Sequence, residues 1–143
     1  MEDAEASKQL GIDNNGLAFW VACIRECFEE VGILLAKKKS GEDLDLDGVD
    51  KHKYQKYREM LLNNEIDLYN ICLEENLILM PQQIAHFSHW ITPEIETRRF
   101  DTRFFIAHLP KHQTGEHDGS APFDSVWISP NEPLKKSRSG EIP

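Results

Sequence analysis

Three glutamates close together in one predicted helix constrain this chain more than any other feature. Glu26, Glu29 and Glu30 occupy positions i, i+3 and i+4, which are neighbours on a helical surface. Like charges placed in this way repel each other unless a cation lies among them. Arg25 supplies one cation, and a bound divalent ion would supply a larger charge, because Mg²⁺ prefers carboxylate oxygens together with substrate phosphates. The pattern therefore indicates either a metal-binding helix or a glutamate-rich solvated face.

The residues around the glutamates predict where this helix begins and ends. One of the polar residues 13–15 can cap a helix that runs from about Gly16 to Val31. Gly32 fits a helix stop, and the apolar run 33–36 then indicates a short buried strand. The expected apolar packing positions on the helix are Phe19, Trp20, Cys23, Cys27 and Val31. These positions leave the glutamate edge nearer solvent.

The helix end resembles the core of the Nudix box, Arg-Glu-x-x-Glu-Glu-x-Gly followed by an aliphatic residue. The matching residues are Arg25, Glu26, Glu29, Glu30, Gly32 and Ile33. Later blocks at 89–93, 98–107 and 127–130 resemble the Trp-x-Thr-Pro, Arg-Phe-Asp-Thr-x-Phe-Phe and Trp-x-x-Pro segments of one Nudix subfamily. That subfamily includes the peroxisomal coenzyme A diphosphatases and their bacterial relatives. The resemblance covers about residues 17–134 and keeps the order of the blocks.

The resemblance implies roles for the residues that match the box. Glu29 and Glu30 would bind Mg²⁺ or Mn²⁺, and Glu26 would be a ligand or the general base. Arg25 would orient a glutamate through paired hydrogen bonds. Arg98 and Arg99 could clamp a substrate phosphate, although a solvated surface role explains them almost as well.

The chain also departs from the family pattern. Leu17 stands where the full box has a glutamate, and no strand is predicted before Gly16, where the family has its first strands. The family often adds an acidic residue from a later loop, and Ala121 occupies the expected position. The nearby acidic residues that could substitute are Glu116, Asp118 and Asp124. We therefore expect the chain to be a fragment, or a gene product that is truncated relative to its relatives.

The predicted fold class is α/β, a Nudix-type α/β/α sandwich with a mixed sheet and a helical insert, lacking its first strands. The partial Nudix domain is expected to span residues 1–134, followed by a polar tail at 135–143. Within the domain, the catalytic helix and its following strand occupy 17–36, a helical insert 51–76 and the later strands 84–130. The insert is expected to hold helices at 51–63 and 65–75, and the strands are expected at 84–91, 99–107 and 125–128.

Composition excludes several function classes. The net charge of −9 argues against a nucleic-acid surface, which is usually basic. No apolar run approaches the roughly 18 residues that a membrane span needs. Two helical cysteines without a second pair do not match a zinc site, and free thiols suit a reducing compartment. We therefore expect a cytoplasmic protein that acts on a small molecule rather than on a membrane or a nucleic acid.

The function that the resemblance implies is metal-dependent hydrolysis of a diphosphate linkage in a nucleoside diphosphate derivative. The substrate would be coenzyme A or an acyl-coenzyme A, cleaved to a phosphopantetheine product and adenosine 3′,5′-bisphosphate. Two alternatives remain open at this stage. One is a Nudix enzyme that acts on a nucleotide sugar or a dinucleotide. The other is a catalytically inactive Nudix-like binding module, which Leu17, Ala121 and the missing first strands favour.

Overall fold

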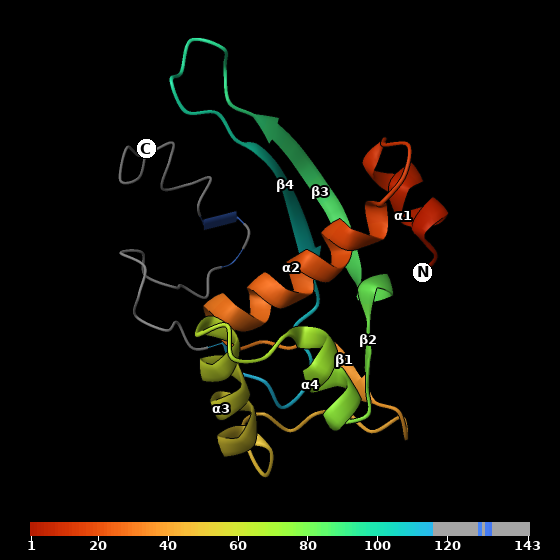
Figure 1. Ribbon diagram of the computed structural model, residues 1–143, viewed down its shortest axis with the longest axis vertical. Helices are drawn as coiled ribbons and strands as arrows, with labels where there is room; N and C mark the ends of the chain where they lie inside the picture. Colours follow the sequence, from red (N-terminus) through yellow and green to blue (C-terminus); the bar gives the residue numbers. More distant parts are fainter. Residues whose placement is uncertain (116–128, 130, 133–143) are drawn as a thin grey trace.

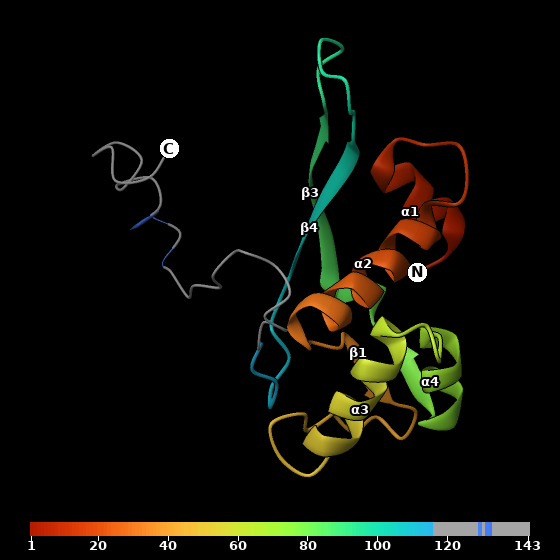
Figure 2. The same cartoon turned by 60° about the vertical axis from the view of Figure 1, so that its left-hand side comes forward.

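A computed structural model describes residues 1–115, 129, 131 and 132 (Figure 1). Among these residues, a long central helix, α2, connects the parts of the molecule. Its first turns lie beside α1, its last turn lies beside α3, and it crosses a long β-hairpin formed by β3 and β4 (Figures 1 and 2). The elements in chain order are α1 (Asp3–Leu10), α2 (Gly16–Val31), β1 (Ala36–Lys38), α3 (Lys51–Leu62), α4 (Leu68–Glu74), β2 (Leu77–Leu79), the 3-10 helix η1 (Pro81–Gln83), β3 (Ile84–Ile91) and β4 (Asp101–Ala107).

Side chains of α1 cap the start of α2. Asn15 occupies the cap position with a φ of 60°, but its own side chain makes no capping hydrogen bond. Asp3 instead accepts hydrogen bonds from the backbone N–H groups of Asn15 and Leu17, each at 2.9 Å. The Ser7 hydroxyl accepts a third from Gly16, also at 2.9 Å. A side chain at Gly16 would overlap the backbone of Ser7, so this glycine allows α1 to approach closely.

Gly32 ends α2, as the sequence predicts. It has a φ of 73°, in the left-handed region that favours glycine, and its N–H donates to the carbonyl of Phe28 at 3.0 Å. The next segment is buried as expected, but strand β1 begins only at Ala36. The reason is that the Gln113 side chain pairs with the backbone of Leu34, accepting from its N–H at 2.9 Å and donating to its carbonyl at 3.1 Å. This side chain occupies the place of a neighbouring strand.

The described strands form two separate antiparallel pairs. Strand β1 pairs with β2 from Ala36 opposite Leu79 to Lys38 opposite Leu77. Strand β3 pairs with β4 along their whole length, with a register shift between His86 and Ser88. The mixed sheet that we predicted is therefore not seen among the described residues, where both sheets have two strands. Strand β2 was not predicted, because three residues are too few to show an alternating pattern.

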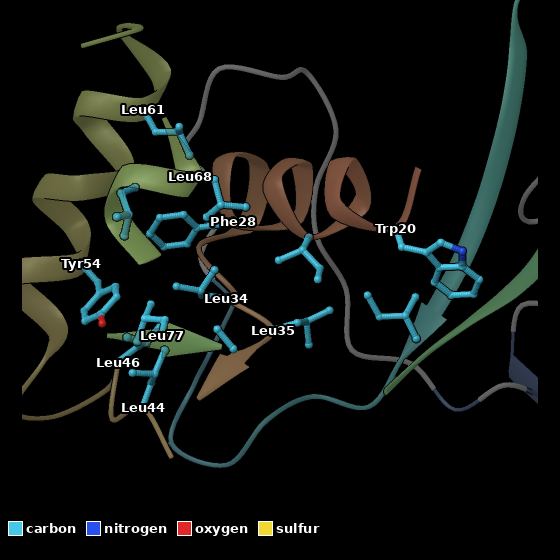
Figure 3. Packing of buried hydrophobic residues seen from close by; sticks show 14 of the residues in the cluster. Trp20, Phe28, Leu34, Leu35, Leu44, Leu46, Tyr54, Leu61, Leu68 and Leu77 are labelled. Atoms are coloured by element: carbon cyan, nitrogen blue, oxygen red, sulfur yellow. The ribbon is translucent and has the colours of Figure 1, made fainter. Parts of the chain in front are cut away.

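The residues that α2 buries are shifted by one position from several of those expected to pack in the core. Trp20, Ile24 and Phe28 are almost fully buried and follow each other at intervals of four residues. Trp20 packs edge-on against Phe105 of β4. Phe28 lies edge-on to Tyr54 of α3 (Figure 3). Of the expected positions only Trp20 is fully buried. Phe19 is exposed, and Cys23, Cys27 and Val31 are half-buried, because their face of α2 borders an open pocket.

Most of the remaining elements agree with the predictions. The insert contains α3 and α4, and the strands expected at 84–91 and 99–107 correspond to β3 and β4. Helix α1 was not predicted, because the first residues are mostly polar and acidic. The strand expected at 125–128 and the tail at 135–143 lie outside the described residues. No helix in the described part of the chain has the length and apolar character that crossing a membrane requires.

Replacing Asp3 by alanine should destabilise the fold by about 1–2 kcal/mol, because two backbone N–H groups at the start of α2 lose their acceptor. Urea unfolding followed by circular dichroism would measure the change in free energy of unfolding. Glu5→Ala is the matched control, since the exposed Glu5 side chain makes no hydrogen bond among the described residues. Equal losses in the two variants would rule out capping by Asp3.

The face of the hairpin opposite α2 should promote self-association of the chain. Trp90 and Ile106 share this face and are 70% and 53% exposed. We expect the 143-residue protein to associate as its concentration rises in sedimentation velocity, and Trp90→Ser/Ile106→Ser to reduce that association. The control is Val49→Ser, which removes an exposed apolar side chain from a loop away from the hairpin. A monomeric wild type at all concentrations would contradict the prediction.

Candidate active site

The predicted glutamates lie on the second half of α2, but they do not all face the same surroundings. The buried stripe faces the core, so the glutamates lie on the remaining surface of the helix. Glu26 and Glu30 are exposed, and both line an open pocket between α2 and β4. Glu29 does not line this pocket, and its side chain is only 13% exposed. The structure therefore brings two of the three carboxylates to one cavity.

Arg25 provides the positive charge that the clustered glutamates require. Its guanidinium forms an ion pair with Glu26 and another with Glu29. The contact with Glu29 measures 2.8 Å and joins residues four apart, where helical side chains meet. Arg25 thus links a carboxylate that lines the pocket to one that does not, and it offsets the repulsion between them. The orienting role that the sequence suggests for Arg25 stays a prediction.

The pocket beside Glu26 and Glu30 has a volume of about 990 Å³ and is mostly apolar. One wall is the face of α2 from Phe19 to Val31, and the other is formed by β4 and the residues after it. The walls contribute the half-buried thiols of Cys23 and Cys27 together with several phenylalanine and aliphatic side chains. The cavity therefore combines two carboxylates with an apolar surface that could bind the non-phosphate part of a ligand.

Arg103 is the cation that the fold brings to this pocket. Its side chain is only 10% exposed, and its guanidinium lies 4.7 Å from the ring centroid of Phe19. It also donates to Asp101 at 3.1 Å, while its buried Nε has no hydrogen-bond partner among the described residues. The signal in the sequence is strand alternation, which puts Arg103 on the same face of β4 as Phe105, towards α2.

Arg98 and Arg99 lie elsewhere. Both are in the loop that joins β3 to β4, and Figure 1 shows this loop at the end of the hairpin away from α3 and the last turn of α2. Arg98 stacks on Phe100, and Arg99 donates to the carbonyl of Thr92 at 3.0 Å. Neither residue lines the pocket with the glutamates. The substrate-binding role that the sequence suggested for them stays a prediction.

The carboxylates fit a magnesium-type ion in their chemistry but do not form a complete cage. Among the described residues, no group of three or more His, Cys, Asp or Glu side chains is arranged to hold a metal ion. Mg²⁺ usually retains several waters and takes only one or two protein carboxylates together with substrate phosphates. Glu26 and Glu30 could supply two such ligands. The later acidic candidates Glu116, Asp118 and Asp124 lie outside the described residues.

The two cysteines in the pocket are protonated thiols near neutral pH. Burial raises the pKa of the Cys27 thiol to about 11, and the neighbouring Cys23 adds to the increase. Burial also raises the pKa of Cys23. Metal ligands and nucleophiles are thiolates, so neither residue suits those roles at neutral pH. This agrees with the prediction that both are free thiols, and the structure contains them as such.

The raised pKa makes the reactivity of Cys27 testable. In a Cys23→Ser/Cys72→Ser background, iodoacetamide should alkylate the folded protein slowly at pH 8, with a midpoint that stays above the ordinary value of 9, because burial is the larger cause of the raised pKa and Cys23 the smaller one. In urea the midpoint should fall to the ordinary value near 9. Because the folded-state value is the higher one, Cys27 favours the folded state below pH 9 and loses this contribution as the pH rises through 11. A midpoint near 9 in the folded protein would contradict the burial of this thiol.

Comparison with known proteins identifies the class and then the family. A crystal structure of a Nudix hydrolase from Alicyclobacillus acidocaldarius matches the fold with a TM-score of 0.71 at 23% identity, covering 99% of this chain and 64% of the other. The α/β fold is thus of the Nudix type, as the motif predicts. A family model described as the NUDT19 Nudix domain matches residues 2–143, and the chain belongs to this family.

Two relatives illustrate how much of the family protein the chain represents. The acyl-coenzyme A diphosphatase NUDT19 of Xenopus laevis is 31% identical over 152 residues, which cover 99% of this chain and 40% of that protein. The protein of the same name from Homo sapiens is 27% identical over 144 residues, covering 91% of this chain and 38% of its own length. The chain therefore spans about two fifths of the length of these relatives.

Proposed function

We propose that this chain carries the metal-binding part of a diphosphatase site that acts on coenzyme A or an acyl-coenzyme A. The observation that carries the proposal is that Glu26 and Glu30 of the Nudix motif line one pocket. Support for the substrate class comes from the relatives, which are named acyl-coenzyme A diphosphatases. The apolar walls of the pocket suit a substrate with an extended non-phosphate arm. A cytoplasmic location remains a prediction.

Glu26 and Glu30 are the residues that would hold Mg²⁺ or Mn²⁺, with Glu29 as a further ligand if it leaves Arg25. When bound, such an ion neutralises the diphosphate oxygens, which otherwise repel a nucleophile, and it lowers the pKa of a coordinated water. Hydrolysis also requires a base for the attacking water. Glu26 is a candidate for this role because it is exposed in the pocket.

The arginines around the pocket have separate tasks in this proposal. Arg25 holds Glu26 and Glu29 in fixed orientations through its two ion pairs. Arg103 supplies a cation inside the pocket, where a guanidinium can bind phosphate oxygens through paired hydrogen bonds. Its stacking on Phe19 and its contact with Asp101 limit its motion, so little conformational entropy would be lost on binding.

The second candidate function is a Nudix-like module that binds a ligand without hydrolysing it. The observation that favours it is the position of Glu29, whose side chain is held by Arg25 and does not line the pocket. A module of this kind would bind a diphosphate, with or without metal, and release it unchanged. A Nudix enzyme with another substrate, such as a nucleotide sugar or a dinucleotide, would instead show turnover with a different preference.

Replacing either carboxylate in the pocket should lower hydrolysis of coenzyme A by about two orders of magnitude or more, because each change removes charge that positions metal or water. The variants are Glu26→Gln and Glu30→Gln, assayed with Mg²⁺ or Mn²⁺ by chromatography of adenosine 3′,5′-bisphosphate. Neither change opens a cavity, since both side chains are exposed. The melting temperature should therefore stay near that of the wild type.

The control is Glu59→Gln, which removes an exposed carboxylate from α3 outside the pocket. Its rate should equal that of the wild type. Equal rates for all variants would place the site elsewhere. A wild type that binds Mn²⁺ and coenzyme A but shows no turnover of coenzyme A, nucleotide sugars or dinucleotides would favour the binding module.

A further inference from the structure

The last turn of α2 carries two of the motif glutamates, Glu29 and Glu30. Its backbone carbonyls need hydrogen-bond donors from outside the helix. The last four carbonyls of any helix receive no hydrogen bond from an N–H group within the helix. Here Gly32 satisfies one of them, the carbonyl of Phe28. The carbonyls of Glu29, Glu30 and Val31 remain, and the first two belong to glutamates of the motif. Whatever binds these two carbonyls also fixes the backbone from which both carboxylates extend.

Arg58 of the helical insert binds both carbonyls. Its Nε donates to the carbonyl of Glu29 at 2.9 Å, and Nη2 donates to that of Glu30 at 2.8 Å. The two bonds come from one planar guanidinium, so they fix the direction of the helix end as well as its position. A cation at this place also interacts favourably with the negative end of the helix dipole. Figures 1 and 2 both show α3 beside the end of α2.

The surroundings make the contact specific to arginine. The Gly32 position faces the guanidinium, and a side chain there would lie 3.3 Å from Nη1 of Arg58. Beyond Gly32, the backbone of Leu34 is held by Gln113. Arg58 thus holds the backbone of the last turn of α2, and Gln113 holds the backbone just after Gly32. A lysine at position 58 could reach only one carbonyl with similar geometry, because its ammonium lacks the planar fork.

We propose that Arg58 is a positioning residue for the metal site: it holds the last turn of α2 so that the carboxylate of Glu30 in the pocket, and that of Glu29 once it leaves Arg25, can bind a divalent ion. This inference rests on the proposed function. It assigns a task to the insert, whose helix α3 reaches the site through a side chain that binds the backbone carbonyls of two motif residues. The motif itself does not include this residue.

The charge of Arg58 and its positioning of the helix end should have opposite effects on metal affinity, which makes the proposal testable. A cation near the carboxylates repels a metal ion, so if Arg58 acted only through its charge, removing it would strengthen metal binding. If it acts by positioning, removing it weakens binding. Arg58→Lys keeps the charge and loses the fork, while Arg58→Gln loses both. Lys56→Gln is the control, since it removes a charge from an exposed site on the same helix.

The measurement is Mn²⁺ affinity by electron paramagnetic resonance, made on the 143-residue protein well below the melting temperature of each variant. Arg58→Lys and Arg58→Gln should each weaken Mn²⁺ binding by about 10-fold, the lower end of the losses seen when groups that orient metal ligands are removed. Lys56→Gln should change it by less than twofold. All affinities are measured while the variant is folded. If Arg58 only stabilised the fold, its replacement would therefore leave the Mn²⁺ affinity of the folded protein unchanged.

Glu29→Gln/Glu30→Gln separates failure of this inference from failure of the proposed function. If the wild type binds Mn²⁺ more tightly than this double variant, and both Arg58 variants match the wild type, Arg58 has no positioning role. Tighter binding by Arg58→Gln with unchanged binding by Arg58→Lys would assign it a charge effect and overturn the proposal. If the wild type binds no better than the double variant, the metal site fails and the role of Arg58 fails with it.

Discussion

The packing of one face of α2 determines how the rest of the described structure is arranged. Trp20 contacts the hairpin and Phe28 contacts α3, so the same stripe joins two parts of the molecule that share few other contacts. Burial of large aromatic side chains supplies much of the stability of a small domain. Because the stripe uses one side of the helix, Glu26 and Glu30 must face outward. The orientation of the candidate site is therefore a consequence of core packing.

The parts of the fold that depend on local sequence could be predicted. The end of α2 at Gly32 and the strands β3 and β4 follow from glycine and apolar patterns within a few positions. The parts that depend on distant residues could not. Asp3 and Ser7 cap α2 from another helix, and Gln113 pairs with a backbone 79 residues away. No pattern within a short window contains these contacts.

The same distinction applies to the candidate site. The motif predicts Arg25, Glu26, Glu29 and Glu30 from their spacing on one helix, and the structure brings two of them, Glu26 and Glu30, to one pocket. The sequence also suggested Arg98 and Arg99, which form a basic cluster with Arg103, but the loop that the first two occupy extends away from the pocket. Arg103 reaches the pocket through the alternation of β4 and the contact of Phe105 with Trp20. Which face of a strand meets a helix is decided by tertiary packing.

The charge arrangement around α2 follows from these positions. Arg25 offsets the charge of two of the glutamates through its ion pairs with Glu26 and Glu29. At the end of the helix, Gly32 and the Arg58 side chain of α3 donate hydrogen bonds to the last carbonyls. A divalent ion would therefore compete with Arg25 for Glu26 and Glu29 but would meet no such competitor at Glu30 among the described contacts. The carboxylate of Glu30 is the one that is exposed, borders the pocket and belongs to a backbone held by a side chain of α3. It is the residue at which a metal ion could first bind with the least rearrangement of the protein.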